Sequence, residues 1–178
     1  MSDLPQIEAR LFADDGRTPN NPKLPLVVMR RTAAASAADP AAWFEETFSS
    51  HGWSGTWRWT VYPYQHFHST NHEVLGIFRG TATLMLGGEQ GAEFEVSVGD
   101  VLVLPAGMGH MRVEASDDFQ VVGAYPGGKE PDLILPGYDL LSARRRIAEV
   151  PLPELDPVAG EGGALFDHWK AGKKRQVR

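Results

Sequence analysis

The sequence predicts an all-β domain, built as a sandwich or barrel, with a helix before it and an extended arm after it. Three observations favour this fold class. From residue 53 to residue 128, short β-rich segments alternate with turn-forming residues. Some of these segments show the period-2 alternation of a half-buried strand. The length of 178 residues fits one domain, so we expect residues 1–52 and 129–178 to be extensions that pack on the barrel of residues 53–128.

The first element with a clear signature is a helix over residues 39–52. Asp39 can cap its first turn, and Pro40 suits the first helical position, where no backbone donor is needed. Phe44 and Phe48 lie four residues apart, so they share one face of the helix. We therefore expect this helix to pack on the barrel.

The strands come from short segments rich in β-branched, apolar and aromatic residues. Glycines fall among them at a spacing of about eight residues, which is typical of an all-β sandwich or barrel. A short apolar run that ends the proline-rich segment 14–31 adds a candidate strand before the helix. The main segments are 55–64, 73–78, 81–86, 93–98, 100–105 and 120–125.

The C-terminal region, residues 138–170, predicts a helix followed by a proline- and glycine-rich arm. Such an arm is too irregular to form a core of its own, so we expect it to wrap the barrel. Basic residues cluster at 144–146 and 170–178, where we expect a solvated helix face and a chain terminus.

Composition excludes several classes of function. The net charge of −6 argues against general nucleic-acid binding. The absence of cysteine excludes disulfides, thiolate metal sites and cysteine nucleophiles. No secretory signal is evident, and no apolar run approaches the roughly 20 residues of a membrane span. We therefore expect a cytoplasmic protein that does not act at a membrane.

The segment 66–73, HFHSTNHE, holds three of the six histidines and a glutamate. On a strand His66 and His68 project from one face about 7 Å apart, which suits two ligands of one metal ion. The intervening Ser-Thr-Asn can break the strand and reset its phase, so that Glu73 starts a new strand. His72 then points away from Glu73.

His110 is the fourth candidate ligand, because an apolar strand and a Pro-Ala-Gly turn lead into it. Sequence spacing alone does not bring His110 near His66; a meander of strands allows it. His68 and His72 are also four residues apart, like two ligands on a helix. The β-forming residues around them and Pro63 disfavour that alternative.

Two spaced motifs carry a resemblance to a known family. Residues 66–80 follow the pattern His66-x-His68-x4-Glu73-x6-Gly80, and residues 99–110 follow Gly99-x5-Pro105-x-Gly107-x2-His110. Together they resemble the two signature motifs of the cupin superfamily, the double-stranded β-helix or jelly-roll barrels. The flanking segments PNNPKLP, HSTNHEVLG and VPLPELDPVAGEGG, with Trp169, are similar to bacterial YjlB-like cupins. Thr60 and Glu114 stand where the general pattern has glycine and asparagine, and neither position is a ligand in the family.

The resemblance implies that one divalent transition metal per chain is held by His66, His68, Glu73 and His110. Unpaired, such buried polar groups would each cost roughly 1–3 kcal/mol, so a cation is the simplest partner for them. A hydrogen-bonded polar cluster is the alternative. Three imidazole nitrogens and a carboxylate oxygen suit iron(II) or manganese, which we favour, and also zinc, nickel, cobalt or copper. The resemblance also implies a homodimer.

The alternation of side chains along a strand also suggests which residues line a pocket around the candidate metal site. Tyr62 and Tyr64 share a face with His66 and His68, and Arg112 shares one with His110. We expect these three residues to bind substrate and His72 to support the ligands from behind or at the rim. Ordinary packing is the alternative for each of them. Trp57 and Trp59 lie on the opposite face, so we expect them to pack under the helix or at a dimer contact.

Function remains divided among classes that this fold hosts. We favour a metal-dependent enzyme, acting on a small organic molecule with dioxygenase-type chemistry. A sugar or sugar-phosphate isomerase would need cationic residues at the mouth, and only Arg112 and Arg79 are available. A non-enzymatic module that binds or senses a small molecule is the third hypothesis. As a catalytic base the sequence offers only Glu73, Glu114 and His72, and none is compelling.

Overall fold

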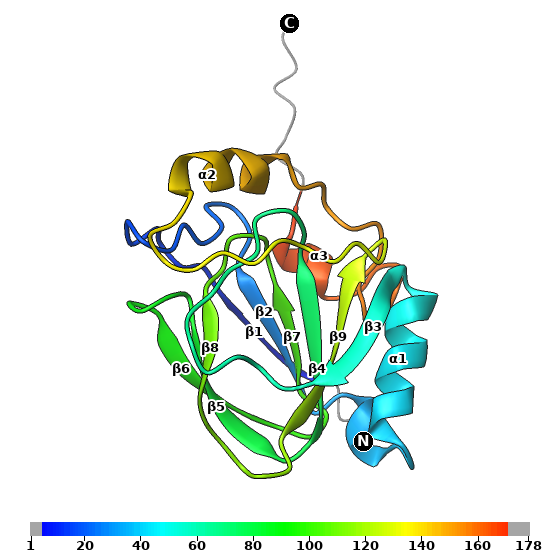
Figure 1. Cartoon of the computed structure of the whole chain (residues 1–178). Helices are drawn as coiled ribbons and strands as arrows, with labels where there is room; N and C mark the ends of the chain where they lie inside the picture. Colours follow the sequence, from blue (N-terminus) through cyan, green and yellow to red (C-terminus); the bar gives the residue numbers. More distant parts are fainter. Residues whose placement is uncertain (1–4, 171–178) are drawn as a thin grey trace, which may run out of the picture.

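The computed structural model describes residues 5–170, within which nine strands form two antiparallel sheets. The large sheet has the order β1-β2-β7-β4-β9-β3, and the small sheet has the order β6-β5-β8 (Figure 1). The strands are β1 (Gln6–Arg10), β2 (Leu26–Arg30), β3 (Trp53–Trp59), β4 (Glu73–Arg79), β5 (Thr81–Leu86), β6 (Ala92–Ser97), β7 (Val101–Leu104), β8 (His110–Ala115) and β9 (Gln120–Pro126).

Four short helices accompany the sheets in this described range. They are the 3-10 helix η1 (Ala33–Ser36), α1 (Pro40–Ser50), α2 (Leu140–Glu149) and α3 (Leu165–His168). α2 crosses one end of the barrel in Figure 1, and α1 runs along its side. Among the described residues, none of these helices has the length and apolar character needed to cross a membrane.

The first core lies between the two sheets. Because side chains of a strand alternate between its faces, β4 turns Leu75 and Ile77 inward and Val74 outward. Leu84 of β5 and Leu102 of β7 meet Leu75 and Ile77 in the same cluster, and each of the four is at most 1% exposed. The large sheet and the small sheet therefore close around one apolar interior.

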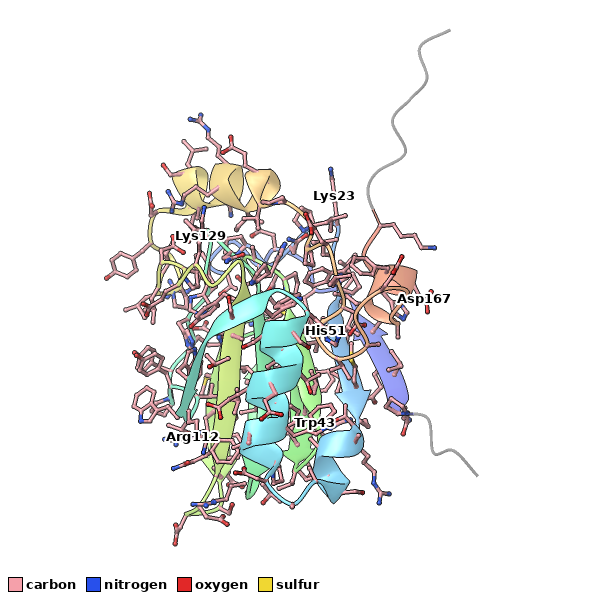
Figure 2. The ribbon with its side chains drawn as sticks, turned by 90° about the vertical axis from the view of Figure 1, so that its right-hand side faces the viewer. Lys23, Trp43, His51, Arg112, Lys129 and Asp167 are labelled. Atoms are coloured by element: carbon pink, nitrogen blue, oxygen red, sulfur yellow. The ribbon has the colours of Figure 1, made fainter. Side chains whose placement is uncertain are left out.

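The second core lies on the outer face of the large sheet, where α1 covers the strands (Figure 2). The Asp39 carboxylate accepts a hydrogen bond from the Ala42 backbone N–H, so the predicted N-terminal cap is confirmed. Phe44 is completely buried, and a β-carbon at Gly76 of β4 would lie 2.6 Å from its ring. Gly76 thus lets the helix approach the sheet.

The C-terminal arm lies along the barrel by way of hydrogen bonds to tryptophan side chains. The Trp53 indole donates to the Leu155 carbonyl, and the Trp169 indole donates to the Pro25 carbonyl. Both indoles are at most 1% exposed. Buried indole N–H groups need acceptors, so the arm is held once by its own Leu155 carbonyl and once by the Pro25 carbonyl of the N-terminal segment.

Two strands, β1 and β8, were not predicted by the pattern of apolar residues. Both lie at the edge of a sheet, and most of their side chains are exposed or only partly buried. Because an edge strand in this position has little surface to bury, its sequence carries no clear alternation.

Candidate metal centre

His66 and His110 meet because their backbones pair. The two residues form an antiparallel bridge, with N···O distances of 3.0 and 3.3 Å between their amides and carbonyls. The His110 N–H is the donor in the shorter bond. The imidazole centroids lie 4.1 Å apart. His66 and His110, 44 residues apart in the sequence, thus become neighbours through β-type pairing, which sequence spacing allows but does not dictate.

Phe67 explains why His66 and His68 face the same way. Its amide and carbonyl both pair with Ile134 at 2.9 Å, and its ring is completely buried against Ile134 and Ala143, on the side of α2. Because side chains alternate along an extended chain, burial of Phe67 on that side directs both histidines to the other.

The three imidazoles all present the same nitrogen to one point. Each Nδ1 lies against a backbone carbonyl: His66 against Tyr64 (3.0 Å), His68 against Asp132 (2.6 Å) and His110 against Met108 (3.1 Å). A carbonyl oxygen only accepts, so each Nδ1 carries the proton and each Nε2 offers a lone pair. One ligand nitrogen of each ring lies within 4.8 Å of the other two.

Glu73 is the first residue of β4 and completes the group with a buried carboxylate. Its Oε1 lies 3.4 Å from His110 Nε2 and 3.7 Å from His68 Nε2. Burial by itself raises the pKa of the Glu73 carboxyl, but His68 and His110 outweigh burial and hold that pKa well below its usual value. Burial lowers the pKa of His66, which favours the neutral imidazole that a metal needs.

The four residues fit a transition-metal ion. Bonds of about 2.0–2.2 Å to nitrogen and oxygen place the ligand atoms around one ion roughly 3–4.4 Å apart, close to the spacing present. Nitrogen and oxygen donors without sulfur suit the borderline and harder divalent metals. The cluster of histidines could therefore bind a metal ion, with Glu73 within reach of the same point.

The cluster lies in a cavity of about 490 Å³. Its floor is formed by the four polar residues, each at most 4% exposed except the half-buried His68. Aromatic side chains form much of the wall. The other lining residues are Gly55, Trp57, Trp59, Thr60, Val61, Tyr62, Leu75, Tyr125, Gly128, Glu130, Pro131 and Leu133.

Tyr125 connects the wall with the cluster. Its hydroxyl accepts a hydrogen bond of 2.8 Å from the Trp57 indole, and the Glu73 carboxylate lies close enough to act on it electrostatically. Burial raises the pKa of Tyr125, and the Glu73 charge raises it further, so this hydroxyl keeps its proton. Sequence reasoning missed Tyr125, although the alternation of β9 places it on the same face as the inward Val121.

The three predicted substrate-binding residues lie in different places. Tyr62 lines the cavity, whereas Tyr64 stacks on the Tyr62 ring and is 42% exposed. Arg112 lies at the margin of the view in Figure 2, and its guanidinium donates to the Thr60 hydroxyl at 3.0 Å. Neither Tyr64 nor Arg112 is among the residues that line the cavity.

The expectation that Trp57 and Trp59 pack beneath the helix is corrected by the structure, and the alternative of a dimer contact stays a prediction. Both tryptophans line the cavity, and Trp57 packs directly over Gly123 of β9. The strand β3 ends at Trp59, and the chain turns through Pro63 before His66. Because the strand is interrupted there, alternation counted from the histidines does not carry back to the tryptophans.

His72 lies on the other side of the chain from Glu73. Its Nδ1 accepts from the Ala106 N–H at 2.9 Å, so its Nε2 carries the proton and donates to the Pro151 carbonyl at 3.1 Å. Burial lowers the pKa of His72 to about 4. Its ring also packs against Trp169, so these contacts join the second motif to the C-terminal arm.

The fold and the site together define a class. Two antiparallel sheets that close around inward histidines and a glutamate, from motifs in this order, are those of a cupin, a double-stranded β-helix barrel. No family model matches the chain. The chain is 39% identical over 165 residues to a protein of Bacillus subtilis (strain 168) that carries the name Uncharacterized protein YjlB, and the match covers 92% of this chain and 97% of that one. The chain therefore belongs to the YjlB family of cupins.

Solved structures of the same kind of fold are much more distant. A protein with a double-stranded β-helix domain from Klebsiella pneumoniae is 14% identical, with 76% of this chain and 81% of that chain covered and a TM-score of 0.35. An acireductone dioxygenase from Bacillus anthracis is 21% identical, with 53% and 62% covered and a TM-score of 0.37. The DMSP lyase DddQ from Ruegeria pomeroyi is 16% identical, with 75% and 52% covered and a TM-score of 0.36. Matches this distant give no information about the activity of this chain.

Proposed function

We propose that the chain is a metal-dependent enzyme that acts on a small organic molecule with dioxygenase-type chemistry. One observation carries the proposal: three Nε2 lone pairs and the Glu73 carboxylate converge on the floor of a cavity large enough for a small substrate. His68 Nε2 and His110 Nε2 lie 3.7 and 3.4 Å from the same Glu73 oxygen, so one ion at this point would satisfy these groups together.

Iron(II) or manganese is the proposed metal, held by His66, His68, Glu73 and His110. Four protein ligands leave two positions of an octahedral ion open, and the bound metal would supply Lewis acidity and a place where substrate oxygen and dioxygen meet. Zinc, nickel, cobalt and copper are compatible with the same donors.

The residues around the cluster have definable tasks in such an enzyme. The backbone carbonyls at Nδ1 fix the tautomer and orientation of the three imidazoles. Tyr125, itself held by Trp57, orients the Glu73 carboxylate through its hydroxyl. The aromatic wall displaces water around the substrate, which strengthens every electrostatic interaction inside.

The lining of the cavity bears on the alternatives. Among the described residues, no lysine or arginine lines it, which disfavours a sugar-phosphate isomerase because a phosphate would lack a cationic partner. A binding or sensing module could use the same cavity. Whether the open positions of the bound metal accept a dioxygen analogue distinguishes such a module from an oxygenase.

The experiment is to purify untagged protein, load it anaerobically with iron(II), measure metal by mass spectrometry and add nitric oxide as a probe of the dioxygen position. We expect about one metal per chain and a spin-3/2 signal by electron paramagnetic resonance. His68→Ala should lose both. His168→Ala, which removes an exposed histidine of α3, is the matched control and should keep both. Protein that holds no metal would refute the proposal, and a bound metal that does not take nitric oxide would refute the oxygenase part.

A further inference from the structure

We propose that the rim of the cavity is a subsite for a cationic head group, so that the substrate is a small organic cation carrying an oxygen donor. The head-group subsite stands on the rim residues alone. The oxygen donor, which would face the cluster on the floor, rests on the proposed function. Trp57, Trp59, Tyr62 and Glu130 form the subsite, and all four line the cavity.

The charges around the cavity favour a cation. Its acidic residues are Glu73 on the floor and Glu130 at the mouth, and within residues 5–170 no lysine or arginine lines it. Basic residues adjacent in sequence to the lining residues are directed elsewhere. Arg58 pairs with Glu45 of α1, and Lys129, next to Glu130 in sequence, lines a separate depression with Pro126 and Gly127. Arg112 donates to Thr60. An anionic head group would meet Glu130 without a compensating cation.

Trp59 and Tyr62 provide the aromatic surface. Their ring centroids lie 5.1 Å apart and the ring planes meet at 80°, so the two rings form a corner at the mouth. Trp59 is 52% exposed, which leaves part of its ring available to a ligand. A cation within about 6 Å of such a ring is attracted by the negative potential of its face.

Glu130 supplies the second, independent element. It is exposed at the mouth, and among the described residues no hydrogen bond or ion pair engages its carboxylate. It lines the same cavity as Trp57 and Tyr62, which places the carboxylate beside the aromatic wall. A neutral ligand bound at the mouth would desolvate this carboxylate without a compensating positive charge, whereas a cation would form an ion pair with it.

Three probes of nearly the same shape test the inference. They are choline, its neutral isostere 3,3-dimethylbutan-1-ol and the carboxylate 3,3-dimethylbutanoate, each titrated by calorimetry and tryptophan fluorescence into metal-free and metal-loaded protein. In metal-free protein we expect choline to bind about tenfold more tightly than the neutral alcohol, since cation–π attraction and one carboxylate act together. The carboxylate probe should not bind metal-free protein.

Two variants assign the preference to the rim. Glu130→Gln keeps the shape of the side chain and should reduce the preference for choline to about threefold or less, while Trp59→Leu should weaken choline more than the alcohol. Glu154→Gln removes a carboxylate of the C-terminal arm that lies outside the cavity, and it should leave all three titrations unchanged.

The outcomes distinguish this inference from the proposed function. Three results would each overturn the cationic subsite, whatever the metal content. They are binding of the alcohol or the carboxylate to metal-free protein at least as tight as that of choline, no binding of choline, and an undiminished preference for choline in Glu130→Gln. A preference for choline in protein that never acquires metal would uphold the subsite and refute the metal-dependent enzyme.

Discussion

The substitution Tyr125→Phe tests whether the aromatic wall supports the metal ligands. It removes one oxygen atom, which accepts from the Trp57 indole at 2.8 Å and lies near the Glu73 carboxylate. The ring of Tyr125 is retained, so the packing of β9 should not change. Loss of the hydrogen bond from Trp57 should affect stability, and loss of the polar neighbour of Glu73 should affect the ligand.

The expected magnitudes follow from the surroundings of each group. The Trp57 indole is only partly buried at the cavity, so water can replace the lost acceptor, and we expect destabilisation of about 1 kcal/mol rather than the larger penalty of a fully buried donor. The Glu73 carboxylate is buried and loses the polar hydroxyl beside it. Removal of such a supporting partner lowers metal affinity by about 10- to 100-fold.

The assay combines urea unfolding of metal-free protein with competition for manganese against a chelator of known affinity. Tyr138→Phe removes an exposed hydroxyl and is the matched control, since its side chain is 67% exposed. If Tyr125→Phe binds metal like the wild type while His68→Ala does not, the wall residue does not support the ligand and the reasoning is wrong. A larger loss in the double variant with Trp57→Phe than in Tyr125→Phe alone would show that Trp57 acts by another route.

Three further predictions concern the supports of the site. His72→Leu leaves the Ala106 N–H and the Pro151 carbonyl without their partners and should destabilise metal-free protein by about 1–3 kcal/mol in urea, whereas a loss below about 0.5 kcal/mol would show that His72 is dispensable. Gly76→Ala forces a β-carbon against the Phe44 ring and should cost about 1–3 kcal/mol; an unchanged unfolding midpoint would contradict the packing of α1 on β4. Manganese at about 100 times its Kd should stabilise the protein by about 2.7 kcal/mol, and removal with a chelator should reverse this; an equal rise of Tm in His68→Ala would place the metal elsewhere.

Much of the architecture could be predicted from the sequence because its signals are local. Short β-rich segments between turn-forming residues mark β4, β5, β7 and β9 close to their observed bounds, and the Asp39 cap marks the start of α1. The edge strands β1 and β8 escaped prediction because they bury little apolar surface. The homodimer and the cytoplasmic location stay predictions.

The cavity was less predictable than the ligand candidates, because its walls come from segments that are distant in sequence. Tyr125 and Glu130 follow the second motif by at least 15 residues, and no pattern links them to His66. Trp57 was assigned to the wrong face since alternation was counted through a break at Pro63, where the extended strand ends. A parity argument holds only along one uninterrupted strand.

The sequence by itself determined the residue types and their order: two histidines and a glutamate in one motif, a histidine in the other, and the strands that carry them. Only the tertiary structure decided that they converge. The backbone bridge between His66 and His110, the burial of Phe67 and the carbonyls at each Nδ1 direct the Nε2 atoms to one point. The physical reason is that periodicity records which face of a strand a side chain takes, whereas the distance between two strands depends on the pairing and packing of the whole chain.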